Sequence, residues 1–359
     1  MKLFFTLIAC CAVLNEAGAQ RVDLDRLTFS ATYRDLPRIS IDSSYHTFSV
    51  VVEGSPGLLK KIEEINPAEV INIPGWRKLN DHAHIQVNTK MEDVFIENTE
   101  LKERIQINKD KNGKETSRKK YHYVAITYSF DARAQVSDFK GNLILNLSLM
   151  NRESKRVYKT QEFSSFLEAT YFLMYNKLNV TETIALIVAA KALNQLNYYL
   201  SENIGYPIRI ASDYLWVLDS RRHPEYDVHR QAVAIFRQAM FQMRADQPLD
   251  EIKVMLQPAI SYFEKVKRNY SSNSKSDRKL RYASYFNLSK IYYYLDDPDN
   301  AMREAGQLIL NDYDARDGKD LESFAINLKF LMDQNKAASR HFSQDIEKFE
   351  GPGMTNASK

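Results

Sequence analysis

Two histidines on alternate positions, His82 and His84, are the first residues of this chain whose types and spacing could do chemistry. Alternate residues of a strand point to the same face, so these imidazoles could bind one metal ion with Asp81 beside them. A metal site needs a third ligand, and the neighbouring sequence identifies none. We therefore interpret the pair as a polar strand face and predict no metal-binding residue.

Four aspartates near Gly318 have the composition of a calcium loop: Asp312, Asp314, Asp317 and Asp320. Their register does not fit an EF-hand, in which a glycine follows the fifth position and a glutamate comes six residues later. The simpler interpretation is a carboxylate-rich loop that caps the helix expected from Leu321 onwards. A bound cation is the alternative.

Residues 221–227 bundle arginine, histidine and carboxylate groups that could perform acid–base work. A proline near a helix start, here Pro224, followed by Glu225 and Asp227 in the first turn is ordinary N-terminal chemistry. The sequence contains no Gly-x-Ser-x-Gly, no His-Glu-x-x-His and no phosphate-binding loop. We predict no catalytic and no cofactor-binding residue, with a hydrolase of scattered carboxylates as the remaining enzymatic alternative.

A basic segment lies between residues 109 and 120, where six cations outnumber two acids: Lys109, Lys111, Lys114, Arg118, Lys119 and Lys120 against Asp110 and Glu115. On a hairpin tip these charges could contact anionic lipid or an acidic partner, which leaves peripheral membrane association open. The preferred interpretation is a solvated hairpin end whose charges discourage edge-to-edge pairing.

The first residues predict a cleavable export signal. Lys2 precedes an apolar run over residues 3–14, and Ala17-Gly18-Ala19 provides a small-x-small cleavage site. Cleavage after Ala19 removes both cysteines, Cys10 and Cys11, so the mature chain has neither a disulfide nor a thiolate nucleophile. Lipidation at Cys10 is the competing interpretation of the same segment.

Composition narrows the class of protein. The chain has 359 residues, 44% of them hydrophobic, which suffices for two ordinary domains. A net charge of +3 does not suggest a nucleic-acid partner. No second apolar segment approaches membrane length, so we expect no transmembrane segment in the mature chain.

Residues 20–163 follow a strand pattern. Phe48, Val50 and Val52 alternate with polar neighbours, as in a half-buried strand. Asn112-Gly113 separates two alternating runs and predicts a hairpin, and a second turn is expected near Gly141. Residues 56–64 predict one short helix. The expected architecture is an antiparallel meander.

Residues 164–345 change to helical periodicity. Ser165 and Glu168 match a capping box, and Asn179 with Glu182 predicts a further helix start. Helical patterns follow over seven stretches: about 179–201, 212–218, 226–245, 249–269, 280–295, 298–311 and 321–336. Residues 346–359 are expected to form a flexible tail. The fold class is therefore α+β, segregated into an antiparallel β-rich domain and an all-α domain.

The region 226–336 resembles the tetratricopeptide repeat, in which paired helices pack through small residues. The resemblance rests on one helix pair, with a less regular pair before it: Leu288, Ser289, Tyr292, Asp296, Asp297, Ala301, Ala305 and Leu308, and then Ala259, Phe263 and Val266. The motif's Trp and central Gly are absent here. The family implies a concave protein-binding surface and usually no catalysis.

Together, an export signal, a β domain and helical repeats look like an envelope or periplasmic protein of a Gram-negative bacterium. We expect a non-enzymatic adaptor or scaffold, periplasmic or associated with the outer membrane, that binds a protein partner through its helices. The alternative is a secreted glycan-binding protein, because the helices also resemble those of outer-membrane starch-binding lipoproteins. That alternative would use tyrosine-rich surfaces such as Tyr292, Tyr293 and Tyr294.

Overall fold

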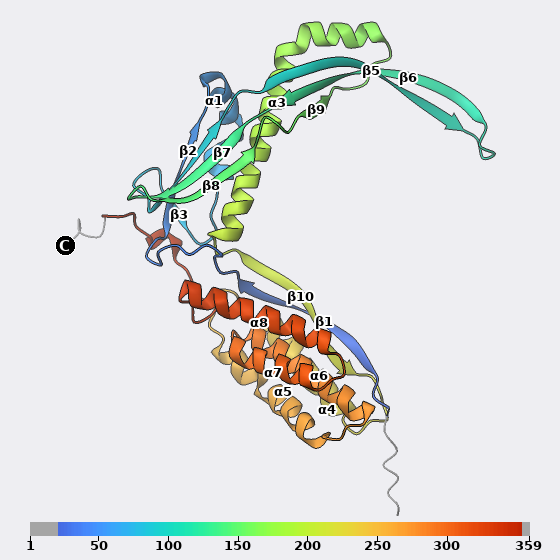
Figure 1. Cartoon of the computed structure of the whole chain (residues 1–359), viewed down its shortest axis with the longest axis vertical. Helices are drawn as coiled ribbons and strands as arrows, with labels where there is room; N and C mark the ends of the chain where they lie inside the picture. The colour runs from blue at the N-terminus through green and yellow to red at the C-terminus, as the bar shows by residue number, and fades with distance from the viewer. Residues whose placement is uncertain (1–20, 354–359) are drawn as a thin grey trace, which may run out of the picture. The chain divides into compact units, whose positions relative to one another are not determined.

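A computed structural model describes residues 21–353, which form two compact units, each described here by itself (Figure 1). The helical unit contains residues 21–34 and Ile208–Ser343, and the sheet unit contains Asp35–Pro207 and residues 344–353. The predicted export signal, with Cys10 and the cleavage site after Ala19, lies outside the described residues, as do residues 354–359.

Five helices build most of the helical unit, and each packs against the next along the chain: α4 (Tyr226–Gln242), α5 (Asp250–Asn269), α6 (Lys275–Tyr294), α7 (Pro298–Leu310) and α8 (Ala315–Asn335). Side chains cap several starts: Ser274 accepts a hydrogen bond from the Asp277 amide, and Asp297 accepts one from Asn300. Pro298 occupies the first turn of α7, where its missing N–H costs nothing.

A two-stranded ribbon completes the helical unit. Strands β1 (Leu24–Arg34) and β10 (Ile208–Leu218) pair antiparallel along their whole length and pack against α4 and α6. The helix predicted over residues 212–218 is therefore wrong. Leu215 and Val217 occupy alternate positions of the strand, and both side chains are buried in the core. The strand is stabilised by pairing with β1, which is almost two hundred residues earlier in the chain, so no local sequence pattern reveals it.

The sheet unit contains a five-stranded sheet in the order β3-β2-β4-β7-β8, formed by β2 (Thr47–Glu53), β3 (Arg77–Lys78), β4 (Ile85–Met91), β7 (Ala132–Asp138) and β8 (Leu143–Met150). The predicted meander is only partly right, because β2 pairs in parallel with both β3 and β4. Between β2 and β4 the chain forms α1 (Pro56–Ile62), a 3-10 turn (Glu63–Ile65) and α2 (Pro67–Val70), and such a crossover makes parallel pairing possible. The turn at Gly141 joins β7 to β8 as predicted.

A second sheet consists of β5 (Phe95–Lys109), β6 (Glu115–Ser129) and β9 (Arg156–Lys159). The structure confirms the predicted hairpin between β5 and β6, with Gly113 at φ +81° in its turn. Only the first part of β5 and the last part of β6 are supported by β9 and α3, and the rest of the hairpin is solvent-exposed.

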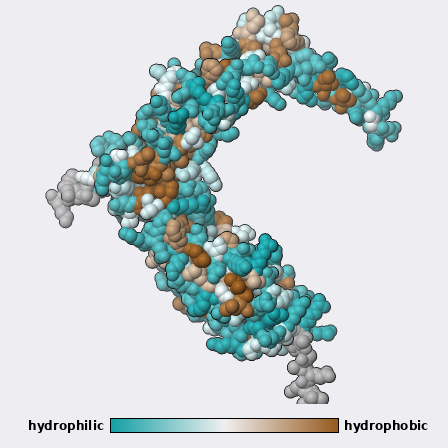
Figure 2. Space-filling view, in the orientation of Figure 1, coloured by the Kyte–Doolittle hydropathy of each residue, from teal (hydrophilic) through white to brown (hydrophobic). Residues whose placement is uncertain are grey.

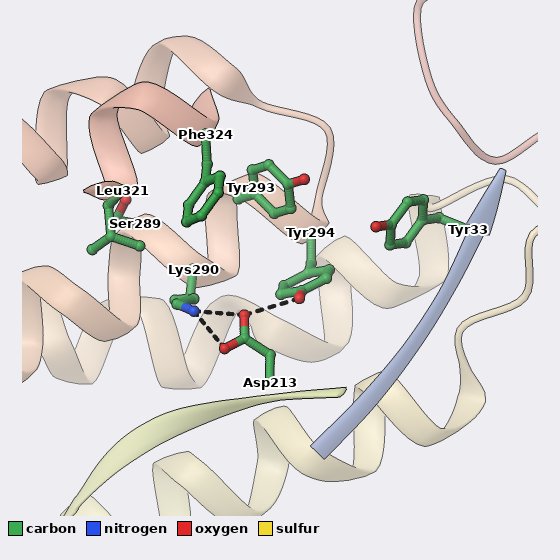
Figure 3. Close-up of a pocket in the computed structure, with 8 residues that line it drawn as sticks. All are labelled: Tyr33, Asp213, Ser289, Lys290, Tyr293, Tyr294, Leu321 and Phe324. Atoms are coloured by element: carbon green, nitrogen blue, oxygen red, sulfur yellow. Dashed lines mark hydrogen bonds and ion pairs between the residues drawn. The ribbon is translucent and has the colours of Figure 1, made fainter. Parts of the chain in front are cut away.

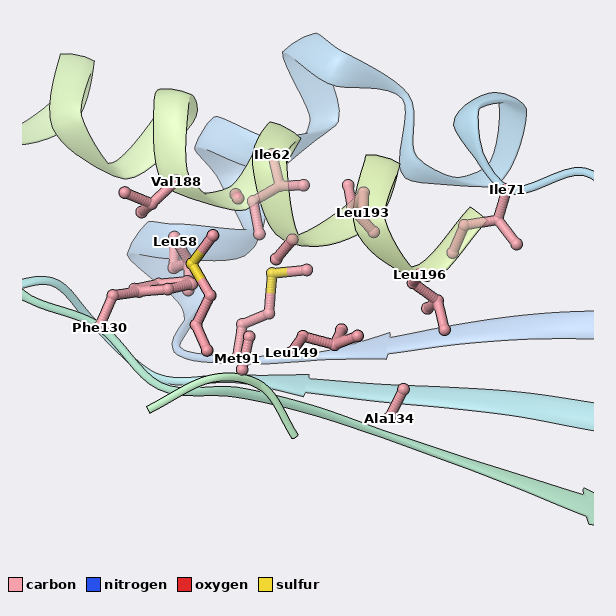
Figure 4. Close-up of a cluster of buried hydrophobic side chains, with 14 of the residues drawn as sticks. Leu58, Ile62, Ile71, Met91, Phe130, Ala134, Leu149, Val188, Leu193 and Leu196 are labelled. Carbon is pink, nitrogen blue, oxygen red and sulfur yellow. The ribbon is translucent and has the colours of Figure 1, made fainter. Parts of the chain in front are cut away.

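Helix α3 (Phe166–Asn203), 38 residues long, covers the five-stranded sheet together with α1 (Figure 4). Figure 4 shows Val188, Leu193 and Leu196 of α3 facing Met91 and Ala134 of the strands. Ser165 accepts the predicted capping bond from the Glu168 amide. The second start predicted at Asn179 is wrong, because the helix runs through it without interruption.

The two units do not divide the chain at residue 164, where the domain boundary was expected. The first strand belongs with the helices, α3 belongs with the sheet, and residues 346–353 lie in the sheet unit instead of a free tail. Phe349 stacks on His46 with ring centroids 4.5 Å apart, and its carbonyl accepts a hydrogen bond from Arg77. The coarse prediction stands: the molecule is mixed α and β, with a strand-rich N-terminal region and helices towards the C-terminus.

Candidate functional site

The helical unit contains a partly open pocket beside β1 and β10 (Figure 3). Its volume is about 150 Å³, which is the size of a cavity that holds one benzene ring. Residues from β1, β10, α6 and α8 line it: Tyr33, Asp213, Ser289, Lys290, Tyr293, Tyr294, Leu321 and Phe324.

A closed polar network forms one side of the pocket. The Lys290 ammonium lies 2.5 and 2.6 Å from the two carboxylate oxygens of Asp213, and the Tyr294 hydroxyl donates a hydrogen bond of 3.0 Å to the same carboxylate. Figure 3 shows these groups converging. The lysine and aspartate side chains are only 11% and 19% exposed. The pocket therefore presents a neutralised ion pair instead of a net charge.

The protonation of Tyr294 is fixed by its surroundings. Burial, followed by the nearby Asp213 charge, raises the pKa of this phenol far above its usual value, so the hydroxyl remains a donor. The Lys290 ammonium also lies over the rings of Tyr214 and Phe286, 5.4 and 5.2 Å from their centroids. These contacts hold the polar side of the pocket in one arrangement.

Aromatic rings form the other walls. Tyr33 and Tyr293 flank the guanidinium of Arg340, whose central carbon is 4.2 and 4.7 Å from their ring centroids. Arg340 itself is buried and paired with Asp296 at 2.6 Å. Phe324 is 58% exposed, so the pocket keeps an aromatic ring that a partner can contact.

The polar side chains of Asp213, Ser289 and Lys290 all have partners within the chain. Ser289 is the serine that lines the pocket, and its hydroxyl donates a hydrogen bond to the carbonyl of Ala301. Among the described residues, no histidine or cysteine lines the pocket. Lys290 is held by a carboxylate, so it is not a free amine for covalent chemistry. Rigid aromatic walls and a neutral polar side are suited to an inserted ring or aliphatic side chain.

The inner face of α4 and α6 is already occupied by β10. Asn287 of α6 donates to the Trp216 carbonyl at 2.8 Å and accepts from the Trp216 amide at 2.9 Å. Nε2 of His229, on α4, lies 3.1 Å from the same carbonyl. These helices thus bind an extended strand through its backbone, and that strand belongs to the chain itself.

The strand face predicted for the two histidines is wrong, because residues 81–84 form a bend before β4 and His82 has a φ of +48°. His82 is exposed beside Asp81, whereas Nδ1 of His84 lies 2.8 Å from the Thr47 hydroxyl and its ring stacks on Tyr45. His84 and His46 border an open hollow of about 540 Å³ in the sheet unit. Among residues 21–353 no group of three or more histidines, cysteines or carboxylates is arranged to hold a metal ion.

The aspartates near Gly318 take structural positions. Asp314 caps α8 through the Arg316 amide, and Asp317 accepts a hydrogen bond from Tyr282. Gly318 lies so close to Ile309 that an added Cβ would come within 2.6 Å of it. This close approach explains a glycine in the first turn of a helix.

Neither of the other two segments singled out in the sequence lines the pocket. His223 Nδ1 accepts a hydrogen bond from the Glu225 amide just before α4, at a helix start as predicted. The basic segment 109–120 forms the exposed end of the β5–β6 hairpin, where Arg118 pairs with Glu115 and Lys120 with Glu103.

Few residues of the pocket could be predicted from the sequence. Tyr293 and Tyr294 stood out as part of an aromatic cluster, but Asp213 lies in a strand expected to be helical and Tyr33 is remote in sequence. Only the folded ribbon brings these residues beside Lys290.

Comparison with known proteins adds no relative: no family model and no curated protein matches this chain. No helix in the described part of the chain is long and apolar enough to cross a membrane.

Proposed function

We propose that this protein is a non-enzymatic adaptor that binds a protein partner through its helical unit, with the pocket between the ribbon, α6 and α8 receiving one anchor side chain. The observation that carries the proposal is the pocket itself. It combines rigid aromatic walls with a neutralised polar side and holds no free nucleophile or base.

The volume and chemistry of the pocket favour an aromatic or branched aliphatic side chain as the anchor. A space of about 150 Å³ accepts one ring, which is the way a binding hot spot buries a single large residue. Because Lys290 and Asp213 neutralise each other, a charged anchor would gain little on entering. A partner therefore contacts the edge of the helical unit, while the inner face of α4 and α6 remains filled by the ribbon.

The repeat resemblance supports the same proposal. The small residues of the pattern, Ser289, Ala301 and Ala305, are buried where α6 packs against α7. Proteins built from such helix pairs are generally binding scaffolds. Together with the predicted export signal, this supports an adaptor of the bacterial envelope, in the periplasm or at the outer membrane.

The glycan-binding alternative has less support in the geometry. It calls for exposed, coplanar aromatic rings, yet Tyr294 is only 3% exposed and its ring is perpendicular to that of Tyr293. These two rings do not make a flat platform for a sugar.

The test compares two matched substitutions on one helix. Phe324 lines the pocket and is 58% exposed, whereas Phe330 is 59% exposed and does not line it. We expect Phe324→Ala to reduce partner recovery at least tenfold in affinity purification from native envelopes, because a hot-spot contact is lost. Phe330→Ala should recover the partner as the unmodified protein does.

Equal recovery with both variants, or no partner with the unmodified protein, would contradict the proposal. In the second case, probing a glycan array with the same protein would test the glycan-binding alternative.

A further inference from the structure

An exposed apolar stripe runs along the first half of α3 in the sheet unit. Its members share one face of the helix, because they recur at spacings of three and four residues: Leu167, Tyr171, Met174, Tyr175 and Leu178. They are 49–80% exposed. Figure 2 includes brown, hydrophobic surface over this part of α3. Soluble proteins seldom leave so continuous an apolar strip uncovered.

The stripe is separate from the face with which α3 joins its own unit. Ala169 and Val180 are buried against the sheet unit, with Phe172 and Leu173 partly buried beside them. Packing within the unit is therefore complete without the stripe. The five residues are available to a second surface and are not misplaced core residues.

The local geometry of α3 also sets this stretch apart. Thr181 and Thr183, which follow the stripe, donate hydroxyl hydrogen bonds to the carbonyls four residues before them. Such back-bonding bends helices. Figure 1 shows α3 with a bend, so that its first part does not follow the line of the part that covers the sheet.

The order of residues in the stripe is self-complementary. Leu167, Tyr171, Met174 and Leu178 are spaced four, three and four apart, as in the seam of a coiled coil. Aligned antiparallel with a second copy, each Leu167 faces Leu178 and each Tyr171 faces Met174. Every seam residue is then matched, in two leucine layers and two layers that pair sulfur with an aromatic ring. A two-fold axis generates this arrangement from one surface.

The flanks of the stripe argue against a membrane as its occupant. Interfacial helices carry Lys and Arg along their polar face. Here the flanking residues include Glu168, Thr170 and Lys177, so cations do not dominate. In the antiparallel alignment these flanks place no two like charges opposite each other.

From this geometry we infer that the first half of α3 is a self-association surface, through which two copies of the chain pair antiparallel. The five side chains offer on the order of 500 Å² per copy, or on the order of 1,000 Å² in all, which lies at the lower limit for a specific interface. The dimer is therefore expected to form with micromolar affinity and to dissociate on dilution.

Sedimentation equilibrium of the full chain tests the inference. We expect a mass that approaches twice the chain mass at high micromolar concentration. Met174→Glu should raise the dimer dissociation constant at least tenfold, because each interface would bury two carboxylates. Val254→Glu on α5 is the control, since Val254 is 73% exposed and Met174 is 68% exposed, and it should leave the constant unchanged. Circular dichroism checks that both variants are folded.

Cysteine cross-linking tests the alignment. The chain has two cysteines, and in a background where both are replaced by serine, Leu167→Cys and Leu178→Cys chains are prepared separately. When they are mixed and oxidised, the antiparallel pair should give a disulfide-linked heterodimer, while each variant alone should remain largely monomeric. Homodimers of Leu167→Cys would overturn the antiparallel alignment.

A chain that is monomeric at all concentrations tested would overturn the self-association surface. So would a monomer that binds phosphatidylglycerol-containing vesicles and loses this binding with Met174→Glu. Both outcomes leave the pocket proposal untouched, because that pocket lies in the other unit.

Discussion

His229 is a buried side chain whose protonation makes the stability of the helical unit depend on pH. Its ring is fully buried on α4, and Nε2 contacts the Trp216 carbonyl at 3.1 Å. Desolvation by burial lowers its pKa to about 4, although the hydrogen bond to the Trp216 carbonyl opposes this shift. The folded protein therefore holds the neutral imidazole, which donates its Nε2 proton to the carbonyl.

This shift predicts acid sensitivity. Above pH 6.5 the ring is neutral in the folded and unfolded states, so it adds no pH dependence. Between pH 6.5 and 4 the unfolded chain takes up a proton that the folded chain does not, so stability falls as the pH falls. The loss should reach about 3 kcal/mol at pH 4. Urea unfolding of the helical unit as a function of pH measures it.

Replacing His229 by glutamine separates this effect from other titrations. Glutamine retains a donor for the carbonyl but does not titrate. The His229→Gln protein should lack most of the extra loss of stability between pH 6.5 and 4, whereas His82→Gln at an exposed site should behave like the unmodified protein. An identical pH dependence in all three proteins would contradict the assignment.

The ribbon and the helices of the helical unit form one core. The ring of Phe29, on β1, makes edge-to-face contacts with Phe236 of α4 and Tyr294 of α6, and the ring centroids are 4.7 and 5.3 Å apart. The backbone of β10 is also fixed by Asn287, which is fully buried. The ribbon is thus a permanent part of the helical unit, and it places Asp213 and Tyr33 at the pocket.

Removing the Asn287 amide should weaken this core. In Asn287→Ala the Trp216 amide loses its partner in a buried site, and its carbonyl retains only His229. We expect the free energy of unfolding to fall by about 2–4 kcal/mol. Ser284→Ala on the same helix is the control, because Ser284 bonds only the carbonyl of Leu280 within that helix, and it should cost less than about 1 kcal/mol. Similar losses in chemical denaturation would contradict the role given to Asn287.

Local signals predicted the elements that local contacts stabilise. The hairpin turn at Gly113 and the capping bond at Ser165 depend on residues a few positions apart, and both are present. Strand β10 depends on β1, and the continuity of α3 past Asn179 depends on packing against the sheet, so neither followed from the sequence. The pocket was missed for the same reason, because Asp213, Lys290 and Tyr33 meet only through that long-range pairing.

The two proposed binding surfaces lie in different units of the molecule. The pocket belongs to the helical unit, and the stripe of α3 belongs to the sheet unit. A dimer that forms through α3 would present two pockets in one assembly. Such an adaptor would gain avidity for a partner with repeated anchor residues.

Photo-cross-linking in native envelopes, with p-benzoylphenylalanine at position 324 or, in the matched control, at position 330, tests whether the pocket contacts a protein partner. We expect one dominant protein adduct from position 324 and much less of it from position 330, because Phe324 lines the pocket and Phe330 does not. Equal adducts from both positions, or none from position 324, would contradict the claim that this pocket binds a protein partner.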